Sequence, residues 1–367
     1  MERLADWTTS RLAGIFDLPT CRFVGLSALI LLLCFFALDA LHALWVWWRA
    51  RRFERTVTRD ANGLLLGAAA YTLEGACPHA PETAILFIHG FNDTPQAWQL
   101  LAPRVHELTG ATCRVMRLPN TAVELKLQHR ARLDFWLDAI RDEVSRLKAC
   151  HEKVFIAGHS LGGGLALLAT RENFSLSPNS ALGEKWVGRD LRARRTPGNL
   201  PLFARLAARP EVAPYPNAEF GLKMDGLILF SPLIRARRKH TRLFALAERL
   251  LWFTRACRTP FPNPIQTKDG RVYGYARDRY VSFAVFRAMF EMARRLAACS
   301  ESPPYPAPTL VFVSERDRLI DVPAVSRFLP GAKIIATTEA GHALALDTGW
   351  EERAAEMAGF VSGGVKK

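Results

Sequence analysis

The sequence lacks the cysteine patterns that indicate a disulfide scaffold or a structural metal site. Its seven cysteines are odd in number and widely spaced, and no Cys-x-x-Cys pair occurs. A disulfide-bonded domain needs paired cysteines, and a structural zinc site needs closely spaced ligands. The chain also has no internal repeat at the spacing of a solenoid. The sequence therefore implies neither a metal nor an organic cofactor.

Acidic residues are fewer than basic ones, with 35 Asp and Glu against 49 Lys and Arg, a formal net charge of +14. Such an excess of positive charge can indicate that the protein binds nucleic acid or an anionic membrane, or it can reflect only an arginine-rich composition. Because no basic and aromatic recognition module is present, nucleic acid is not expected as a partner. At 49% hydrophobic and 23% charged residues, the 367-residue chain can bury a full core and is not disordered.

A long stretch without charge lies near the N-terminus and reads FVGLSALILLLCFFAL over residues 23–38. Asp39 interrupts it, and the apolar run then continues to three tryptophans and a group of arginines. A membrane-spanning helix needs about 20 apolar residues, and tryptophan followed by arginine is typical of the membrane interface. We expect an N-terminal segment over 1–22, a transmembrane anchor over 23–48 and a folded domain over 56–367.

The same segment lacks the features of a cleaved signal peptide. Its leading region is long, no Ala-x-Ala site follows the apolar core, and no small residue directly precedes Cys34. A buried core helix is the other alternative, which the tryptophan and arginine border disfavours. More arginines follow the span than precede it. We therefore expect a single-pass protein of the bacterial inner membrane with its folded domain in the cytoplasm.

Beyond residue 55, strand-like and helix-like runs alternate, which predicts a mostly parallel sheet covered by helices on both faces. Thr94 is the expected N-cap of the first of these helices. In such sheets, ligands bind at the carboxyl ends of the strands. The expected strands lie at 63–73, 84–88, 113–118, 154–157, 225–230, 309–313 and 333–336, and the expected helices at 95–108, 127–150 and 351–360.

The segment VFIAGHSLGGGLALLAT, residues 154–170, places Ser160 between an apolar strand and an apolar helix. A chain that passes so quickly from strand to helix turns sharply, and the turn residue adopts a strained conformation. Gly158 and Gly162 allow the strand and the helix to approach closely. The pattern predicts a nucleophilic serine at the edge of the sheet; the alternative is a glycine-rich turn with an incidental serine.

A nucleophilic serine needs a base and an acid that orients the base. Asp317 and His342 each follow an expected strand, and the order Ser160, Asp317, His342 is the one expected after such a turn. We expect His159 to point away from the serine beside it. The alternative acids are Glu315 and Asp321, and the alternative bases are His42, His89 and His159.

An acyl-transfer site also needs hydrogen-bond donors for the oxyanion. Leu161 supplies one backbone N–H at the start of the helix after the serine. The second donor is expected in the loop that follows strand 84–88, where we assign the N–H of Phe91. The alternative is that His89 and Gly90 only form a tight turn.

Together these segments resemble the α/β-hydrolase superfamily, most closely its bacterial esterase, monoacylglycerol lipase and lysophospholipase branch, also called serine aminopeptidase-like. The resemblance covers about residues 60–360 and implies an α/β-hydrolase fold with a cap or lid inside an insertion at 234–278. A second insertion is expected at 171–223. Residues 118–121 depart from the Gly-His-Gly loop of many relatives. The matching segments are AILFIHGF, GHSLGGG, LILFSP, LVFVSERD and EAGHALAL.

We therefore interpret the chain as a membrane-anchored serine hydrolase that cleaves carboxylic esters of the lipid or lysophospholipid type through an acyl-enzyme. The same triad serves a thioesterase or an acyltransferase, and a catalytically silent binding module on a membrane tether is an alternative from another class. The tetrapeptide RARR occurs at 49–52, 192–195 and 235–238. Its copies near the site suggest contact with anionic lipid, or else ordinary solvated surface.

Overall fold

The computed structural model describes residues 18–75, 82–171, 224–235, 238–259, 265–266, 272–274, 277–299 and 307–363. Nearly all of the insertion expected at 171–223, including the basic cluster 192–195, lies outside these residues. So does most of the N-terminal segment expected at 1–22.

A seven-stranded sheet forms the centre of the molecule, with the strand order β1-β3-β2-β4-β5-β10-β11. β1 is antiparallel to β3, and every other neighbouring pair in this sheet is parallel. The predicted mostly parallel sheet is confirmed. Its strands are β1 Tyr71–Leu73, β2 Thr83–Ile88, β3 Thr112–Met116, β4 Lys153–His159, β5 Gly226–Phe230, β10 Thr309–Ser314 and β11 Lys333–Thr337.

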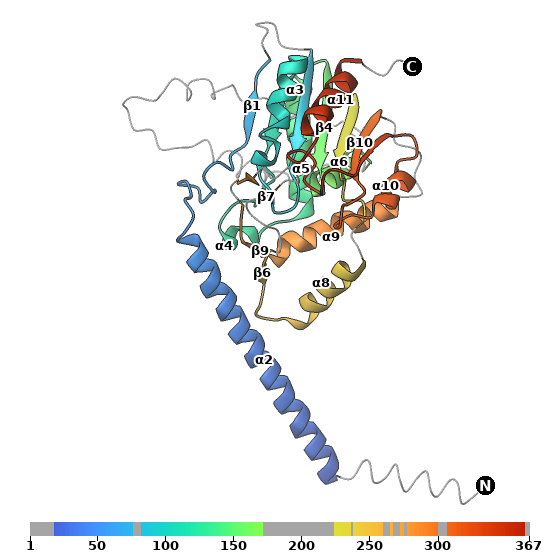
Figure 1. The fold of residues 1–367 in the computed structure, drawn as a ribbon. Helices are drawn as coiled ribbons and strands as arrows, with labels where there is room; N and C mark the ends of the chain where they lie inside the picture. Colours follow the sequence, from blue (N-terminus) through green and yellow to red (C-terminus); the bar gives the residue numbers. More distant parts are fainter. Residues whose placement is uncertain are drawn as a thin grey trace, which may run out of the picture.

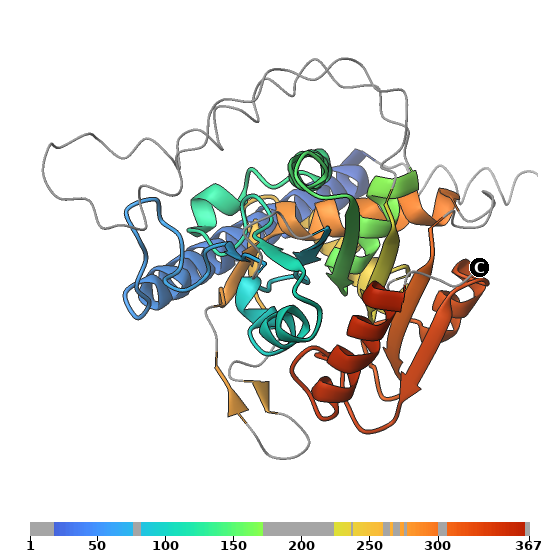
Figure 2. The same cartoon turned by 90° about the horizontal axis from the view of Figure 1, so that it is seen from above.

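Helices cover both faces of the sheet, as the view from above shows (Figure 2). Alternate residues of β2 belong to different cores: Leu86 and Ile88 pack with α5, α6 and α9, whereas Phe87 packs with α3 and α11. The period of two along a strand therefore builds two apolar layers. The helices are α3 Leu101–Thr109, α5 Leu133–Lys148, α6 Leu161–Arg171, α9 Phe283–Ala298, α10 Val322–Phe328 and α11 Trp350–Gly363.

Three predicted elements differ from the structure. The strand expected at 63–73 shortens to β1, because Gly63 and Gly67 adopt positive φ angles of 77° and 84° that break the extended run. The helix expected at 95–108 divides into the short 3₁₀ helix η1 Pro95–Trp98 and α3, and Thr94 makes no side-chain capping bond.

The helix expected at 127–150 divides into α4 Leu125–Gln128 and α5. Gln128 is buried at the break, where its amide donates to the Val123 carbonyl oxygen and accepts from the Ser282 backbone N–H. These tertiary contacts outweigh the local helical preference of the sequence.

A long helix, α2 Leu18–Glu54, extends away from the sheet domain (Figure 1). Its part Phe23–Glu54 is the one described helix that is long and apolar enough to cross a membrane. The helix continues beyond the expected end of the anchor at residue 48. Val46 and Ala50 are buried against Ala256 and Tyr280. The end of α2 is thus packed into the catalytic domain, which the sequence did not indicate.

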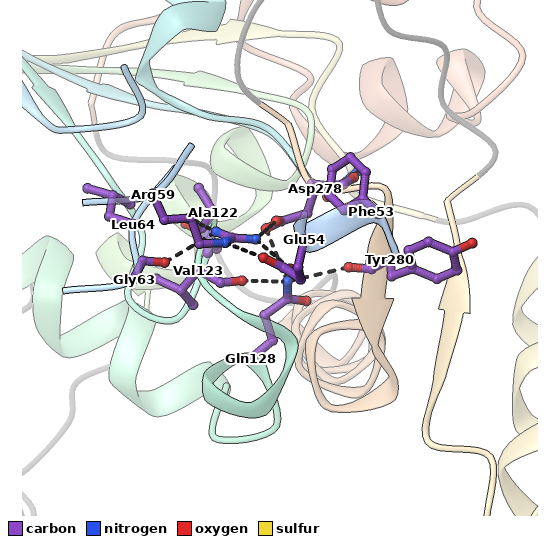
Figure 3. Close-up of polar contacts among 12 residues, drawn as sticks. Phe53, Glu54, Arg59, Gly63, Leu64, Ala122, Val123, Gln128, Asp278 and Tyr280 are labelled. Atoms are coloured by element: carbon purple, nitrogen blue, oxygen red, sulfur yellow. Dashed lines mark hydrogen bonds and ion pairs between the residues drawn. The ribbon is translucent and has the colours of Figure 1, made fainter. Parts of the chain in front are cut away.

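Arg59 fixes this junction through a buried network (Figure 3). Its guanidinium contacts Glu54, the last residue of α2, at 2.6 Å and Asp278 at 2.8 Å. It also donates to the carbonyl oxygens of Gly63 and Ala122. Burial raises the pKa of Asp278 to about 7, and the charge of Arg59 opposes this rise. One cation therefore joins the helix, the following loop and the segment before β9 (Tyr280–Ser282).

Replacing Arg59 should destabilise the fold strongly. Because Arg59→Ala leaves the buried carboxylate of Asp278 without its cation, we expect the free energy of unfolding to fall by about 3–5 kcal/mol. Arg104→Ala is the matched control, since its pair with Glu107 is exposed and is worth at most about 1 kcal/mol. Denaturant titration in detergent, followed by circular dichroism, compares the two variants. Equal losses of stability would contradict this account of the junction.

Candidate active site

Ser160 occupies a strained turn between β4 and α6. Its φ angle of 51° lies in the left-handed region, which is rare for a residue other than glycine. The turn is held by backbone bonds on both sides: the Ser160 N–H donates to the Phe230 carbonyl oxygen at 2.9 Å, and the Ser160 carbonyl oxygen accepts from Leu233 N–H at 2.9 Å. Strain of this kind, fixed by its surroundings, is typical of functional positions.

Two glycines allow the strand and the helix to approach as closely as the sequence predicts. A Cβ atom on Gly158 would lie 2.6 Å from the Gly162 carbonyl oxygen, and one on Gly162 would lie 2.3 Å from the Ile88 carbonyl oxygen. Neither distance leaves room for a side chain. Backbone therefore packs directly on backbone around Ser160.

Asp317 and His342 meet at the same edge of the sheet. They follow β10 and β11, and the Asp317 Oδ2 atom accepts a hydrogen bond from His342 Nδ1 at 2.6 Å. The other carboxylate oxygen accepts from the N–H groups of Leu319 and Ile320. The Asp317 side chain is completely buried.

The two alternative acids lie in different surroundings. Glu315 is exposed to solvent. Asp321 precedes α10, and its carboxylate lies 3.9 Å from the guanidinium of Arg327. Three acidic residues follow β10. Among the described side chains, Asp317 is the one of these three that bonds His342.

The surroundings of this pair favour a charged carboxylate and a neutral imidazole. For Asp317, burial raises the pKa, but the hydrogen bond and charge of His342, with help from Leu319 and Ser231, bring it below its ordinary value. For His342, burial lowers the pKa, and the bond to Asp317 opposes this effect only in part. A neutral His342 that donates from Nδ1 keeps a lone pair on Nε2, as a general base requires.

The Ser160 hydroxyl makes no hydrogen bond to another described residue, and the hydrogen bonds of Ser160 to these residues use its backbone. His159, the residue before Ser160, bonds the backbone of His342. In structures without substrate, the contact between a nucleophile and its base is often longer than in the working complex.

His159 has a role that the sequence did not indicate. Its Nε2 atom donates to the carbonyl oxygen of His342 at 2.9 Å, and the centres of the two rings lie 5.0 Å apart. On its other side, Nδ1 lies 3.6 Å from the carboxylate of Asp93, which pairs with Arg277 at 2.6 Å. His159 therefore supports the backbone that carries His342. Its position beside Ser160 was the one available sequence signal.

The remaining alternative bases are occupied by structural bonds. His89 donates from Nδ1 to the Gly90 carbonyl oxygen and accepts at Nε2 from Leu118 N–H. Burial lowers the pKa of His89 to about 4, so this ring is neutral. His42 lies in α2, where its Nδ1 atom contacts the Thr254 hydroxyl at 3.0 Å.

Arg353 of α11 holds the loop that contains His342. Its guanidinium donates to the carbonyl oxygens of Leu344, Asp347 and Thr348 at 2.9, 2.7 and 2.6 Å. The Asp347 carboxylate in turn accepts from Gly341 N–H. The loop that carries His342 is thus held by bonds from the helix that follows it, α11, although no sequence motif indicates these bonds.

The proposed oxyanion donors lie on the two segments nearest Ser160. Leu161 is the first residue of α6, and the first N–H groups of a helix have no partner within it. The loop after β2 passes close to the serine, because a Cβ atom on Gly90 would lie 3.3 Å from the Cβ atom of Ser160. Phe91 follows directly. Among the described residues, no group of His, Cys, Asp and Glu side chains is arranged to hold a metal ion.

Comparison with known families agrees with this architecture. Residues 85–358 match the model of the alpha/beta hydrolase family, which is most of the chain. The chain belongs to the α/β-hydrolase family. Membership identifies this α/β hydrolase as an enzyme of the serine hydrolase type, as the sequence predicted. A search of curated protein sequences found no significant match.

Solved structures of lipolytic enzymes share this fold. One of the metagenome-derived lipolytic enzymes LipS and LipT aligns with a TM-score of 0.58 and 13% identity, over 82% of this chain and 99% of that one. The monoacylglycerol lipase of Paleococcus ferrophilus aligns with a TM-score of 0.52 and 15% identity, over 80% of this chain and 98% of that one. The monoglyceride lipase of Saccharomyces cerevisiae, a soluble variant, aligns with a TM-score of 0.54 and 14% identity, over 81% of this chain and 92% of that one. At these identities the likeness establishes the fold.

The contacts of the two acids predict different effects of substitution. Asp317→Asn should lower kcat on a soluble p-nitrophenyl ester on the order of 10³- to 10⁴-fold, because the amide no longer stabilises a protonated His342. Asp321→Asn, the matched control after the same strand, should change kcat by less than about twofold, because it removes only a surface charge. Steady-state kinetics on both variants decide between them, and the reverse ranking would assign the acid to Asp321.

Proposed function

We propose that this α/β hydrolase is a membrane-anchored serine esterase that cleaves carboxylic esters of the lipid or lysophospholipid type. One observation carries the proposal: a buried carboxylate, Asp317, bonds His342 at 2.6 Å at the sheet edge that also holds Ser160 in a strained turn. Strand order supports this assembly, since β4, β5, β10 and β11 are neighbours and end at one edge.

The chemistry follows from these positions. The Ser160 oxygen attacks the acyl carbonyl carbon while His342 Nε2 takes its proton, and Asp317 stabilises the resulting imidazolium. The N–H groups of Phe91 and Leu161 hold the oxyanion. His342 then protonates the departing alcohol, which leaves an acyl-enzyme. A water molecule, deprotonated by His342, releases the carboxylic acid and restores Ser160.

The N-terminal helix supports the membrane anchor. Its apolar side chains are exposed over most of the stretch from residue 23 to residue 48, and tryptophans and arginines form a belt at its end. The belt consists of Arg49 over Trp45, Arg51 over Trp47 and Arg52 over Trp48. The positive flank after the span supports a cytoplasmic catalytic domain.

Lipases of monoacylglycerol are among the structural neighbours, which supports a lipid ester as substrate.

Substitution of the nucleophile tests the proposed function. Ser160→Ala should lower kcat on p-nitrophenyl esters by at least about 10³-fold, because oxyanion stabilisation and binding alone remain. A fold check by circular dichroism should show no change. A variant that keeps more than a tenth of the rate would remove Ser160 from the mechanism. A wild-type protein inactive on both ester and thioester substrates would favour a binding module.

The pH dependence of the reaction follows from the lowered pKa of His342. Only the neutral imidazole accepts the serine proton, so kcat/KM should rise with pH as His342 loses its own proton. Since burial holds this pKa below the ordinary 6.5, the half-maximal rate should lie below pH 6.5, with a plateau at neutral pH. Initial rates on p-nitrophenyl acetate from pH 4.5 to 8 measure it. A midpoint above 6.5 would contradict the assignment of this base.

A further inference from the structure

Asp39 interrupts the apolar surface of α2, yet its side chain is buried. Its carboxylate accepts three backbone hydrogen bonds from one segment: Trp252 N–H at 2.6 Å, Phe253 N–H at 2.7 Å and Thr254 N–H at 3.2 Å. An ionised residue within a spanning helix is costly and usually marks a functional contact. Here it binds the chain directly after α8 Arg238–Leu250, which lies in the expected lid.

Side chains extend this contact along the helix. The Thr254 hydroxyl donates to the Asp39 carbonyl oxygen and contacts His42. One turn earlier, the Phe36 ring lies 6.4 Å from the ring of Phe253. Residues 252–254 are therefore docked on α2 over the length from residue 36 to residue 42. We call this set of contacts the Asp39 clasp.

The depth of the Asp39 clasp follows from the helix geometry. Asp39 lies six residues before Trp45, which corresponds to about 9 Å along the helix. The clasp is therefore on the membrane side of the tryptophan and arginine belt. Trp252 and Phe253 are nevertheless 68% and 49% exposed. Large apolar side chains exposed at this depth face hydrocarbon when the anchor spans a bilayer.

Helix α8 presents a second exposed apolar face that continues this surface. Leu243, Leu246 and Leu250 lie on one side of the helix, as their spacing of three and four residues dictates, and all three are exposed. Figure 1 shows α8 on the side of the domain from which α2 extends.

The opposite side of α8 leads toward the active site. The Phe244 ring lies 5.2 Å from Phe286 of α9, and Phe286 lies 4.7 Å from Phe91. Phe91 belongs to the loop against Ser160. Arg287 of α9 and Glu248 of α8 add an ion pair at 3.0 Å. A line of aromatic side chains thus connects the lid helix with the site of acyl transfer.

We infer that the Asp39 clasp makes the spanning helix part of the lid. The clasp holds Trp252, Phe253 and the outer face of α8, which is the side with Leu243, Leu246 and Leu250, in the bilayer. A lipid of the same membrane then reaches Ser160 with its acyl ester along Phe244, Phe286 and Phe91. The partner of this surface is the hydrocarbon layer itself. The inference rests on the proposed esterase function and adds the route of the substrate.

Full-length protein in phosphatidylcholine vesicles that contain a monoacylglycerol tests the clasp. Asp39→Ala should speed hydrogen exchange at the amides of Trp252, Phe253 and Thr254 at least tenfold, because their acceptor is gone. Hydrolysis of the vesicle lipid should fall at least tenfold, while hydrolysis of p-nitrophenyl acetate should stay within twofold. Since the substitution removes a charge from the span, weaker anchoring cannot explain the loss.

Leu38→Ala is the matched control, because Leu38 is the exposed neighbour of Asp39 at the same depth. It should change neither the exchange rates nor either hydrolysis rate. Asp39→Asn keeps an oxygen acceptor and should restore part of the protection. Unchanged exchange in Asp39→Ala, or equal effects on lipid and soluble ester, would overturn the inference. Wild-type protein inactive on both substrates would overturn the proposed function instead, and the exchange result would still stand on its own.

A second variant tests whether the outer face of α8 contacts the bilayer or a second copy of the chain. Leu246→Asp alters this face without touching Phe244 and should lower hydrolysis of vesicle lipid with no change on the soluble ester. The mass in detergent, measured by light scattering, should not change. If the mass falls and lipid hydrolysis falls with it, the face packs against a second copy of the chain and the bilayer contact is overturned.

Discussion

The close approach of β4 to α6 is the constraint on which the candidate active site depends. Around Ser160 the neighbours are backbone atoms: Gly158 faces the Gly162 carbonyl, and Gly162 faces the carbonyl of Ile88 in the adjacent strand. Backbone cannot move aside as a side chain can, so the left-handed conformation of Ser160 is enforced from both sides. The same turn bonds Phe230 and Leu233. It therefore fixes the serine relative to β5 and, through β10, relative to Asp317.

The sequence alone predicted that Ser160, Asp317 and His342 lie at one edge of the sheet, because the signal for each residue is local in the sequence. Each of Ser160, Asp317 and His342 follows a short apolar strand, and parallel strands end at a common edge. Contacts between distant segments could not be predicted in this way. The bond from His159 to the His342 backbone depends on how the loop after β11 folds back over the sheet. The support from Arg353 comes from the helix that follows this loop, but no sequence motif indicates it. The division of α4 from α5 likewise depends on Gln128 and its bonds to the distant residues Asp278 and Ser282.

The N-terminal helix α2 also makes contacts with distant segments that could not be predicted from the sequence. The apolar run is evident in the sequence, and Asp39 interrupts it. The structure gives that carboxylate three backbone partners in the segment after α8. Arg59 makes a second connection, because it pairs both with Glu54 at the end of α2 and with Asp278 of the sheet domain. In the membrane anchoring that we propose, this junction would set the height and the orientation of the catalytic domain relative to the bilayer.

Covalent labelling tests the central claim, that Ser160 is the activated nucleophile, most directly. The tryptic peptide of residues 154–171 contains Ser160 as its single serine. After reaction of the full-length protein with a fluorophosphonate, mass spectrometry should find one adduct, on Ser160 in this peptide, and His342→Ala should greatly slow its formation. An adduct on another residue, or ester hydrolysis that continues in unlabelled protein after prolonged exposure to the probe, would contradict the account.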